Sequence, residues 1–281
     1  MRSLLVTGGT GTFGRSFIKA CLAQPQWDRI VVYSRGEHAQ AAMAEELAAH
    51  SERVRFFIGD VRDLDRLCRA CNKVDVIIHA AALKRIEVGH YNPDEMVKTN
   101  VLGTMNVVEA ALSSSVKKVV GLSSDKAWQP ISPYGQSKAL AETILLNANN
   151  IGGLDGPVFN VVRYGNVAGS NGSVIPRWRR AIARGDTIRI SDPDCTRFWM
   201  TIEEAVNLVL KALAAPRGSM LIPTLPAYRL ADLAAALGAE KYELTGLPDW
   251  EKKHEGMSAG NTSDVARRMS IDELQVALEV V

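Results

Sequence analysis

The stretch SLLVTGGTGTFGRSFIKA, residues 3–20, decides the fold. Its apolar run at 3–6 predicts a short buried strand, and the segment 15–24 has the apolar spacing of a helix. The GxxGxxG turn between them lets the backbone approach a pyrophosphate, whose negative charge the following helix N-terminus favours. We therefore predict a dinucleotide site, with a tight turn that merely needs glycine as the alternative. The candidate cofactor contacts in this turn are Gly8, Thr10, Gly11, Thr12, Phe13 and Gly14.

The alternation of strands and helices continues from this unit to about residue 165. Further apolar runs predict strands at 29–33, 54–58, 74–78, 119–122 and 158–162. Helical spacing falls near 38–50, 63–72, 94–113 and 134–149. This order predicts an α/β fold with a doubly wound parallel sheet.

The pattern becomes irregular after residue 165, where glycine and proline recur. We expect a dinucleotide-binding domain over 1–165, with a helix at 202–215 returning to it. A small substrate-binding lobe would comprise 166–201 and 216–281. Its tail, from residue 264, reads as a polar loop followed by a short helix.

Residues at the ends of the predicted strands give the other candidate cofactor contacts. Arg35, beside Ser34, suits a 2′-phosphate, so the expected cofactor is NADP, although a solvated loop arginine is the alternative. Asp60, beside Val61, could accept a hydrogen bond from an adenine amino group. The small residues from Ala80 onward would let a nicotinamide lie close to the backbone.

The string SSDKAWQPISPYGQSK, residues 123–138, carries the candidate catalytic groups. Asp125, Lys126 and Tyr134 can each move a proton, and they follow a strand end, where open α/β sheets place their ligands. Lys138 stands one helical turn after Tyr134, so the two can share a helix face. Two separate acid/base tasks are therefore possible at one site. The alternative for Asp125 and Lys126 is an ordinary surface pair that caps a turn.

Composition excludes several classes of protein. The chain has 281 residues and a formal net charge of +2, too small for a nucleic-acid protein. No apolar stretch has membrane-spanning length, and the first residues run into a strand without a signal peptide. The four cysteines fit a reducing cytoplasm. Cys68 and Cys71 form a CxxC without a second ligand pair, so we expect no metal and a helix with one cysteine packed inward.

The glycine turn, the Tyr134-x-x-x-Lys138 pair and the domain order resemble the extended short-chain dehydrogenase/reductase superfamily. Within it, several strings resemble the inverting UDP-N-acetylglucosamine 4,6-dehydratases of bacterial polysaccharide and flagellin-sugar synthesis. These strings are residues 123–138, HAAALKRIEVGHYNP at 79–93, KTNVLGTMNVVEAA at 98–111, VRYGNVAGSNGSVIP at 162–176 and TRFWMTIEEAV at 196–206. The Asp-Lys pair is the specific part, because retaining dehydratases carry Asp-Glu there and simple epimerases carry no such pair.

This resemblance implies a mechanism. Tyr134, as a phenolate favoured by the Lys138 ammonium and the positive nicotinamide, would take the C4 hydroxyl proton while hydride leaves for NADP+. Lys126 would remove the C5 proton as a neutral amine, which a partly dry, cation-rich pocket would encourage. Asp125, kept protonated, would protonate the departing C6 hydroxyl. Hydride would return to C6, and reprotonation on the opposite face would invert C5, giving UDP-2-acetamido-2,6-dideoxy-β-L-arabino-hexos-4-ulose.

The resemblance also implies substrate contacts and a homo-oligomer. The candidate substrate contacts are Lys84, Ser124, Asn166, Ser173, Val174 and Arg197, and Lys84 would touch the cofactor as well. Their alternatives are a solvated lysine, a loop-capping serine, a plain Gly-Asn-x-x-Gly turn and, for Arg197, a buried structural ion pair. We expect His79 to pack at a strand end without a catalytic role. Trp128, Trp178 and Trp250 are expected to pack rather than stack on a base.

One segment departs from the family pattern GxRPGEKxHE. Residues 246–255 read GLPDWEKKHE, with Pro248 in place of the arginine expected to meet the nucleotide. The nucleotide and the sugar therefore stay open. A nucleotide-sugar 4-epimerase, a dehydratase of another nucleotide sugar and a non-catalytic NADP-binding regulator are the alternatives.

Overall fold

A seven-stranded parallel sheet forms the centre of the computed structural model, which describes residues 2–239 and 241–281. The strand order β3-β2-β1-β4-β5-β6-β9 reverses direction between β1 and β4, which opens a crevice at their carboxyl ends. The prediction of a doubly wound α/β fold is confirmed. The strands are β1 (Ser3–Thr7), β2 (Arg29–Ser34), β3 (Val54–Ile58), β4 (Val76–His79), β5 (Lys118–Leu122), β6 (Val158–Val162) and β9 (Met220–Leu221).

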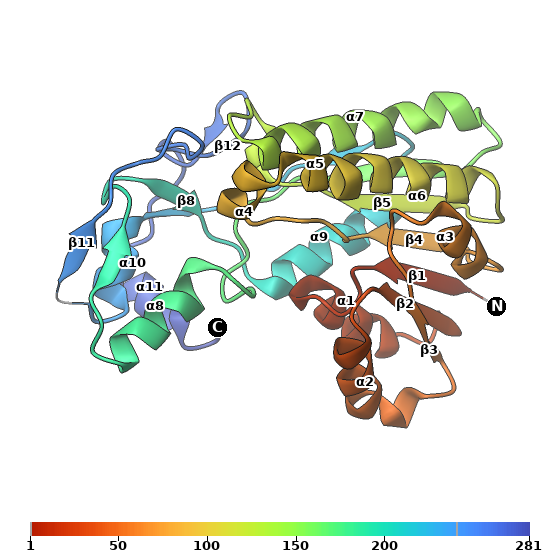
Figure 1. Cartoon of the computed structure of the whole chain (residues 1–281), viewed down its shortest axis with the longest axis horizontal. Coiled ribbons are helices and arrows are strands. Elements are labelled where there is room, and N and C mark those ends of the chain that lie inside the picture. Colours follow the sequence, from red (N-terminus) through yellow and green to blue (C-terminus); the bar gives the residue numbers. More distant parts are fainter. Residues whose placement is uncertain (1, 240) are drawn as a thin grey trace.

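Helices cover both faces of this sheet (Figure 1). One face packs against α1 (Thr12–Leu22), α2 (Glu37–Glu46) and α9 (Ile202–Ala214), with the short 3-10 turn η1 (Ala48–His50) after α2. The other face packs against α3 (Leu64–Ala70), α6 (Gly103–Leu112) and α7 (Pro133–Gly152). The sheet is therefore buried on both sides, as its nearly continuous apolar strands require.

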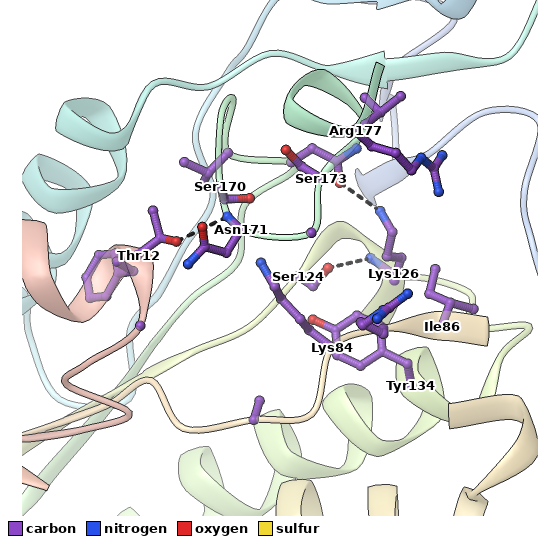
Figure 2. Close-up of a pocket in the computed structure, with 18 of the residues that line it drawn as sticks. Thr12, Lys84, Ile86, Ser124, Lys126, Tyr134, Ser170, Asn171, Ser173 and Arg177 are labelled. Atoms are coloured by element: carbon purple, nitrogen blue, oxygen red, sulfur yellow. Dashed lines mark hydrogen bonds between the residues drawn. The ribbon is translucent and has the colours of Figure 1, made fainter. Parts of the chain in front are cut away.

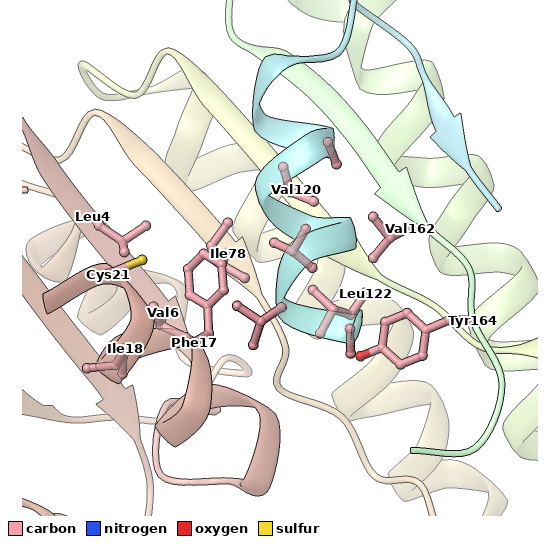
Figure 3. Close-up of a cluster of buried hydrophobic side chains, with 14 of the residues drawn as sticks. Leu4, Val6, Phe17, Ile18, Cys21, Ile78, Val120, Leu122, Val162 and Tyr164 are labelled. Atoms are coloured by element: carbon pink, nitrogen blue, oxygen red, sulfur yellow. The ribbon is translucent and has the colours of Figure 1, made fainter. Parts of the chain in front are cut away.

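Helix α9 lies on the main sheet beside α1, although it follows a long excursion of the chain (Figure 3). Its apolar side chains Ala205, Val209 and Ala212 are fully buried at helical spacing. A capping box fixes its start, because Thr201 accepts from the Glu204 backbone N–H while Glu204 accepts from that of Thr201.

The helix expected over 94–113 is broken into three pieces. They are α5 (Pro93–Met96), the π-helical segment η2 (Val97–Leu102) and α6, and α4 (Ile86–Tyr91) precedes them. The side chain of Asn100 lies in the π segment, where it accepts from Leu83 N at 2.8 Å and donates to Leu83 O and Ser137 Oγ at 2.9 Å. The wider turn thus fastens the loop after β4 to α7.

The irregular part of the chain forms a lobe beyond the carboxyl ends of the strands (Figure 1). Strands β7 (Ile188–Ile190) and β11 (Tyr242–Leu244) pair in parallel, and β8 (Thr196–Phe198) pairs antiparallel with β10 (Ala227–Arg229). Helices α8 (Val174–Ala183), α10 (Leu230–Ala236) and α11 (Ile271–Leu278) complete it, with the β12 (Gly256–Ser258) and β13 (Asn261–Thr262) hairpin. A separate buried cluster, which includes Trp178, Trp199 and Leu233, holds it together, so we propose the division into two domains described above.

Within the described part of the chain, no helix is long and apolar enough to cross a membrane.

Candidate active site

A large cavity lies between the sheet and the lobe, at the carboxyl ends of β1, β4 and β5. Its volume is about 1290 Å³. A site for one drug-sized ligand occupies roughly 300–1,000 Å³. The cavity therefore has room for more than one ligand. Each predicted cofactor residue, from Gly8 in the glycine turn to Lys84 after β4, borders it.

The glycine turn leaves no room for side chains where the chain passes closest to itself. Gly8 has a φ of +66°, and a Cβ there would stand 2.9 Å from the Ala81 Cα. A Cβ on Gly14 would stand 2.6 Å from the Gly9 carbonyl oxygen. The turn is thus a bare backbone cradle that leads into the N-terminus of α1, an arrangement that fits a dinucleotide pyrophosphate.

The end of β2 holds the residues expected to decide between NAD and NADP. The Arg35 side chain is 54% exposed, and its nearest ion-pair contact joins Arg35 Nη1 to Asp60 Oδ2 at 3.5 Å. Asp60 is held more tightly by Arg62, whose Nη2 lies 2.7 Å from Oδ2. Burial by itself would raise the pKa of Asp60, but the hydrogen bonds from Arg62 bring it below the usual value. Arg35 is therefore free to turn toward a phosphate.

Tyr134 and Lys138 follow β5 on the first turns of α7, and both are buried. Burial raises the pKa of Tyr134, while a hydrogen bond with Ser124 and the charge of Lys126 act in the opposite direction. Lys138 Nζ donates to Leu122 O at 2.5 Å, and burial lowers the pKa of Lys138 to about 8. Both side chains border the cavity, so the expected pair is assembled on one helix face.

The neutral amine expected of Lys126 is contradicted by the two carboxylates that lie against it. Lys126 Nζ lies 3.0 Å from Asp125 Oδ1 and 3.2 Å from Glu255 Oε1, and it also contacts Asn166 Oδ1 at 3.2 Å. Burial alone would lower the pKa of Lys126, but the two carboxylates outweigh it and raise the pKa. The resting side chain is an ammonium rather than a neutral amine.

Asp125 is fully buried and lies behind the residues that border the cavity. Burial raises the pKa of Asp125, in the direction that a protonated acid requires. Its Oδ1 accepts from Ser124 Oγ at 2.8 Å, and Ser124 borders the cavity. Asp125 therefore does not border the cavity itself, whereas its hydrogen-bond partner Ser124 does.

Two residues of this site escaped the sequence analysis. Glu255 precedes β12, is only 2% exposed and reaches Lys126 from the lobe. Tyr228, on β10, is buried and hydrogen-bonds Asn166. The only signal for Glu255 in the sequence was its position in the His-Glu pair that ends the string 246–255. Tyr228 had no signal, because it lies on a strand too short to show a periodic pattern.

The candidate substrate residues face the cavity from both sides (Figure 2). Lys84 projects from the loop after β4, and burial lowers its pKa. Asn166 and Ser173 come from the loop that leads into α8, and Val174 is the first residue of that helix. That loop also touches the glycine turn, because Asn171 N donates to Thr12 Oγ1 at 3.2 Å.

Arg197 borders the cavity, but its guanidinium is already engaged. It donates to Thr196 O at 2.7 Å and Lys253 O at 3.1 Å, and it pairs with Glu251 Oε1 at 2.5 Å. These bonds match the buried ion pair that was the alternative for this residue. Among the candidate residues, Arg197 is therefore the one with the least freedom to meet a diphosphate.

The histidine and the tryptophans that the sequence analysis singled out pack against neighbouring side chains. His79 is buried between Thr7 and Thr104, and burial lowers its pKa to about 3, so its ring is neutral. Trp128 lies under Arg163, and Trp178 belongs to the lobe core. Trp250 stacks on His90 with ring centroids 4.3 Å apart.

In the predicted CxxC, the half-buried Cys68 lies on α3 and the buried Cys71 is the C-cap of that helix. No group of potential metal ligands occurs among residues 2–239 and 241–281.

The strand order, the bare glycine turn and the Tyr134–Lys138 pair at the end of β5 together define an extended short-chain dehydrogenase/reductase. The chain belongs to the family described as "Polysaccharide biosynthesis protein", which matches residues 4–276.

Curated relatives within this group carry two different activities. The "UDP-N-acetylglucosamine 4,6-dehydratase (inverting)" of Campylobacter jejuni is 40% identical over 265 residues, which is 93% of this chain and 79% of that protein. A "UDP-glucose 4-epimerase" of Rickettsia canadensis is 37% identical over 265 residues, covering 91% of this chain and 77% of that protein.

Solved structures show the same architecture. Pen from Bacillus thuringiensis superposes with a TM-score of 0.94 at 33% identity, covering 100% of this chain and 98% of that one. DesIV, a dTDP-glucose 4,6-dehydratase from Streptomyces venezuelae solved with NAD, gives a TM-score of 0.84 at 22% identity, covering 99% and 96% of the two chains.

Proposed function

We propose that this protein is an NADP-dependent nucleotide-sugar 4,6-dehydratase that inverts C5 and acts on UDP-N-acetylglucosamine. The observation that carries the proposal is the second acid/base set, Asp125 and Lys126, beside Tyr134 in one site. An enzyme that only oxidises and reduces C4 needs Tyr134 and Lys138. A dehydratase needs, in addition, a base for C5 and an acid for the C6 hydroxyl.

The proposed cofactor site combines the glycine turn with Arg35. When bound, the dinucleotide accepts a hydride from the sugar and later returns it to C6. The Streptomyces dehydratase was solved with NAD, so the preference for NADP rests on Arg35 alone. Replacing it by Arg35→Ala should weaken NADP+ binding by about tenfold or more, equivalent to about 1.4 kcal/mol, and leave NAD+ binding nearly unchanged. Fluorescence titration with both dinucleotides measures this, and an equal loss for both would contradict the assignment.

The oxidation half of the reaction uses Tyr134, Ser124 and Lys138. Tyr134 takes the proton of the C4 hydroxyl; burial raises its pKa, and the hydrogen bond with Ser124 and the charge of Lys126 act against burial to favour the phenolate. Lys138, held by Leu122 O, adds positive charge at the same helix face. The resulting 4-ketone makes the C5 proton acidic.

The elimination half uses Lys126 and Asp125. Lys126 removes the C5 proton, and the C6 hydroxyl leaves as water with a proton from Asp125, whose Oδ1 accepts a hydrogen bond from the Ser124 hydroxyl at the cavity wall. Burial raises the pKa of Asp125, which favours the protonated form that this donation requires. Reprotonation of C5 on the opposite face then gives the L-arabino product.

The test of this proposal is mass spectrometry of the protein incubated with UDP-N-acetylglucosamine in D2O without added reductant. Loss of one water with deuterium at C5 supports the dehydratase, and NMR of the product gives the C5 configuration. An unchanged mass without deuterium, followed by the same result with other nucleotide sugars, would contradict it.

The base is tested by Lys126→Ala. We expect C5 deuterium exchange to fall by at least about 100-fold, the usual contribution of a general base, while NADP+ binding stays nearly intact. Dehydration at the wild-type rate would show that another group removes the proton.

A nucleotide-sugar 4-epimerase is the second candidate, because the Rickettsia relatives carry that name and Pro248, which replaces the arginine of the family pattern, borders the cavity. An epimer has the mass of the substrate, so the same experiment separates the two. A non-catalytic NADP-binding regulator would turn over no nucleotide sugar, and the assembled Tyr134 and Lys138 argue against it.

We also propose a homo-oligomer, which light scattering of the purified protein tests. A cytoplasmic location fits the four unpaired cysteines.

A further inference from the structure

We infer, on the basis of the proposed function, that Glu255 is the final acceptor of the C5 proton and that Lys126 relays the proton to it. Glu255 lies behind Lys126 and does not border the cavity, so it acts through Lys126 as a positioning residue.

The geometry holds Glu255 ready for this transfer. Its backbone N–H donates to Ser263 Oγ at 2.8 Å, which fixes the residue at the start of β12. Its Oε1 lies 3.2 Å from Lys126 Nζ. Its Oε2 is buried without a hydrogen bond, with Lys252 Nζ at 3.7 Å. The carboxylate is thus aimed at Lys126 and is only partly satisfied.

The charges around Glu255 decide where protons rest before the reaction. It faces Lys126 from η3 (Asp125–Ala127), Arg197 from β8 and Lys252 from its own segment, with Asp125 beyond Lys126. Burial alone would raise the pKa of Glu255, but these three cations bring it below its usual value. Glu255 therefore begins as a carboxylate.

An ammonium cannot remove a proton, so Lys126 in this setting needs an acceptor of its own. As the C5–H bond breaks, its proton goes to Lys126 Nζ and one Nζ proton moves to Glu255 Oε1. The electron pair left at C5 expels the C6 hydroxyl, which leaves as water with the Asp125 proton. Tyr134 and Glu255 each end with one extra proton, and Asp125 and the donor to C5 each lose one, so the protons balance.

The two carboxylates that flank Lys126 thereby receive opposite tasks. Asp125 is buried beside the cation Lys126, and burial raises the pKa of Asp125. Glu255 is surrounded by three cations, which lower its pKa. A pair of acids whose surroundings separate their pKa values is a common way to provide one acid and one base at a single site. Asp125 gives its proton to the leaving group, and Glu255 takes the proton from C5.

The test compares Glu255→Gln with the wild type under single-turnover conditions with 5-deuterated and ordinary UDP-N-acetylglucosamine. Glutamine keeps the shape and a hydrogen bond to Lys126 but accepts no proton. We expect the C5 step to slow by at least about 100-fold while C4 oxidation persists, so reduced nicotinamide accumulates early in the reaction. Glu255→Asp should restore part of the rate. A purely electrostatic role predicts the reverse, because removing a carboxylate makes the neutral amine of Lys126 easier to form.

The pH dependence of the wild type tests the same inference without a variant. With Glu255 as acceptor, the rate of the C5 step stays flat through the neutral range and falls only in acid, where Glu255 becomes protonated. If Lys126 had to lose its proton to water first, the rate would rise about tenfold per pH unit, which is the behaviour we expect of Glu255→Gln. Glu243→Gln is the matched control, because Glu243 pairs with the exposed Arg189 rather than with Lys126, and its loss should leave the flat profile.

A wild-type rate that rises with pH, or a Glu255→Gln protein as fast as the wild type at neutral pH, would overturn the inference. Wild-type protein that dehydrates no nucleotide sugar would instead overturn the proposed function, so the two failures are distinct.

Discussion

Lys138 is a buried lysine whose charge has a measurable effect on folding. Burial lowers its pKa to about 8, against 10.5 for the free side chain. Between these two values the unfolded chain binds a proton that the folded chain does not. The contribution of Lys138 to the free energy of unfolding therefore increases as the pH rises from about 8 to 10.5, so through this group the protein becomes more stable over that range.

We predict that Lys138→Met abolishes this rise. Urea unfolding of both proteins across that pH range measures it, and substitution of the exposed Lys211 on α9 by Met is the control that should keep the wild-type slope. Parallel curves for the wild type and Lys138→Met would show that the Lys138 ammonium is not destabilised by the fold.

Among the site residues, the sequence correctly grouped those that lie close together along the chain. Ser124, Asp125, Lys126, Tyr134 and Lys138 belong to one strand–turn–helix unit, so their spacing already implied a common site. The protonation state of Lys126 was wrongly predicted because its second carboxylate partner, Glu255, comes from the lobe. No local pattern reports a charge that approaches from such a distance along the chain.

The start of α9 depends on one capping side chain, so a single substitution can weaken it. Thr201→Ala removes the side chain that accepts from Glu204 N at 3.1 Å and breaks the reciprocal capping box. We predict a loss of about 1 kcal/mol in the free energy of unfolding, measured in urea. Ser270→Ala removes the same cap from α11 and serves as the matched comparison. If Thr201→Ala proved as stable as the wild type, the cap would not contribute to the stability of α9.

Elements with a strong period were predicted well, and those shaped by a single contact were not. Strands β1 to β6 follow from their apolar runs, and helices α1 and α7 follow from their apolar spacing, whereas the short strand β9 was not predicted. The division of 94–113 by a π-helical segment depends on bonds from Asn100 to Leu83 and Ser137, which join distant parts of the chain. The strands of the lobe, two or three residues long, are too short to show a period.

An aromatic pair is one of the contacts that join the two domains. Trp250, in the lobe segment that departs from the family pattern, stacks on His90 of α4. Such an aromatic pair contributes about 0.5–1.5 kcal/mol. It holds the lobe against the sheet domain at a site away from the glycine turn.

We predict that Trp250→Ala raises the KM for the nucleotide sugar by up to about tenfold and leaves NADP+ affinity unchanged. Steady-state kinetics with a dinucleotide titration measures both quantities. Trp250→Phe, which keeps a ring over His90, should stay close to the wild type. An equal loss of NADP+ affinity would place the effect of the stack in the sheet domain.

The ion pairs around Lys126 have an evolutionary consequence, because Lys126 and Asp125 belong to the sheet domain whereas Glu255 comes from the lobe. Recombination that exchanged the lobe between relatives would give Lys126 a foreign partner in place of Glu255. A neutral newcomer at that position would leave a hybrid that folds and binds dinucleotide but stalls after the first oxidation. Residues 125–126 and residue 255 are therefore expected to be inherited together, and this linkage restricts how freely the specificity lobe can be swapped.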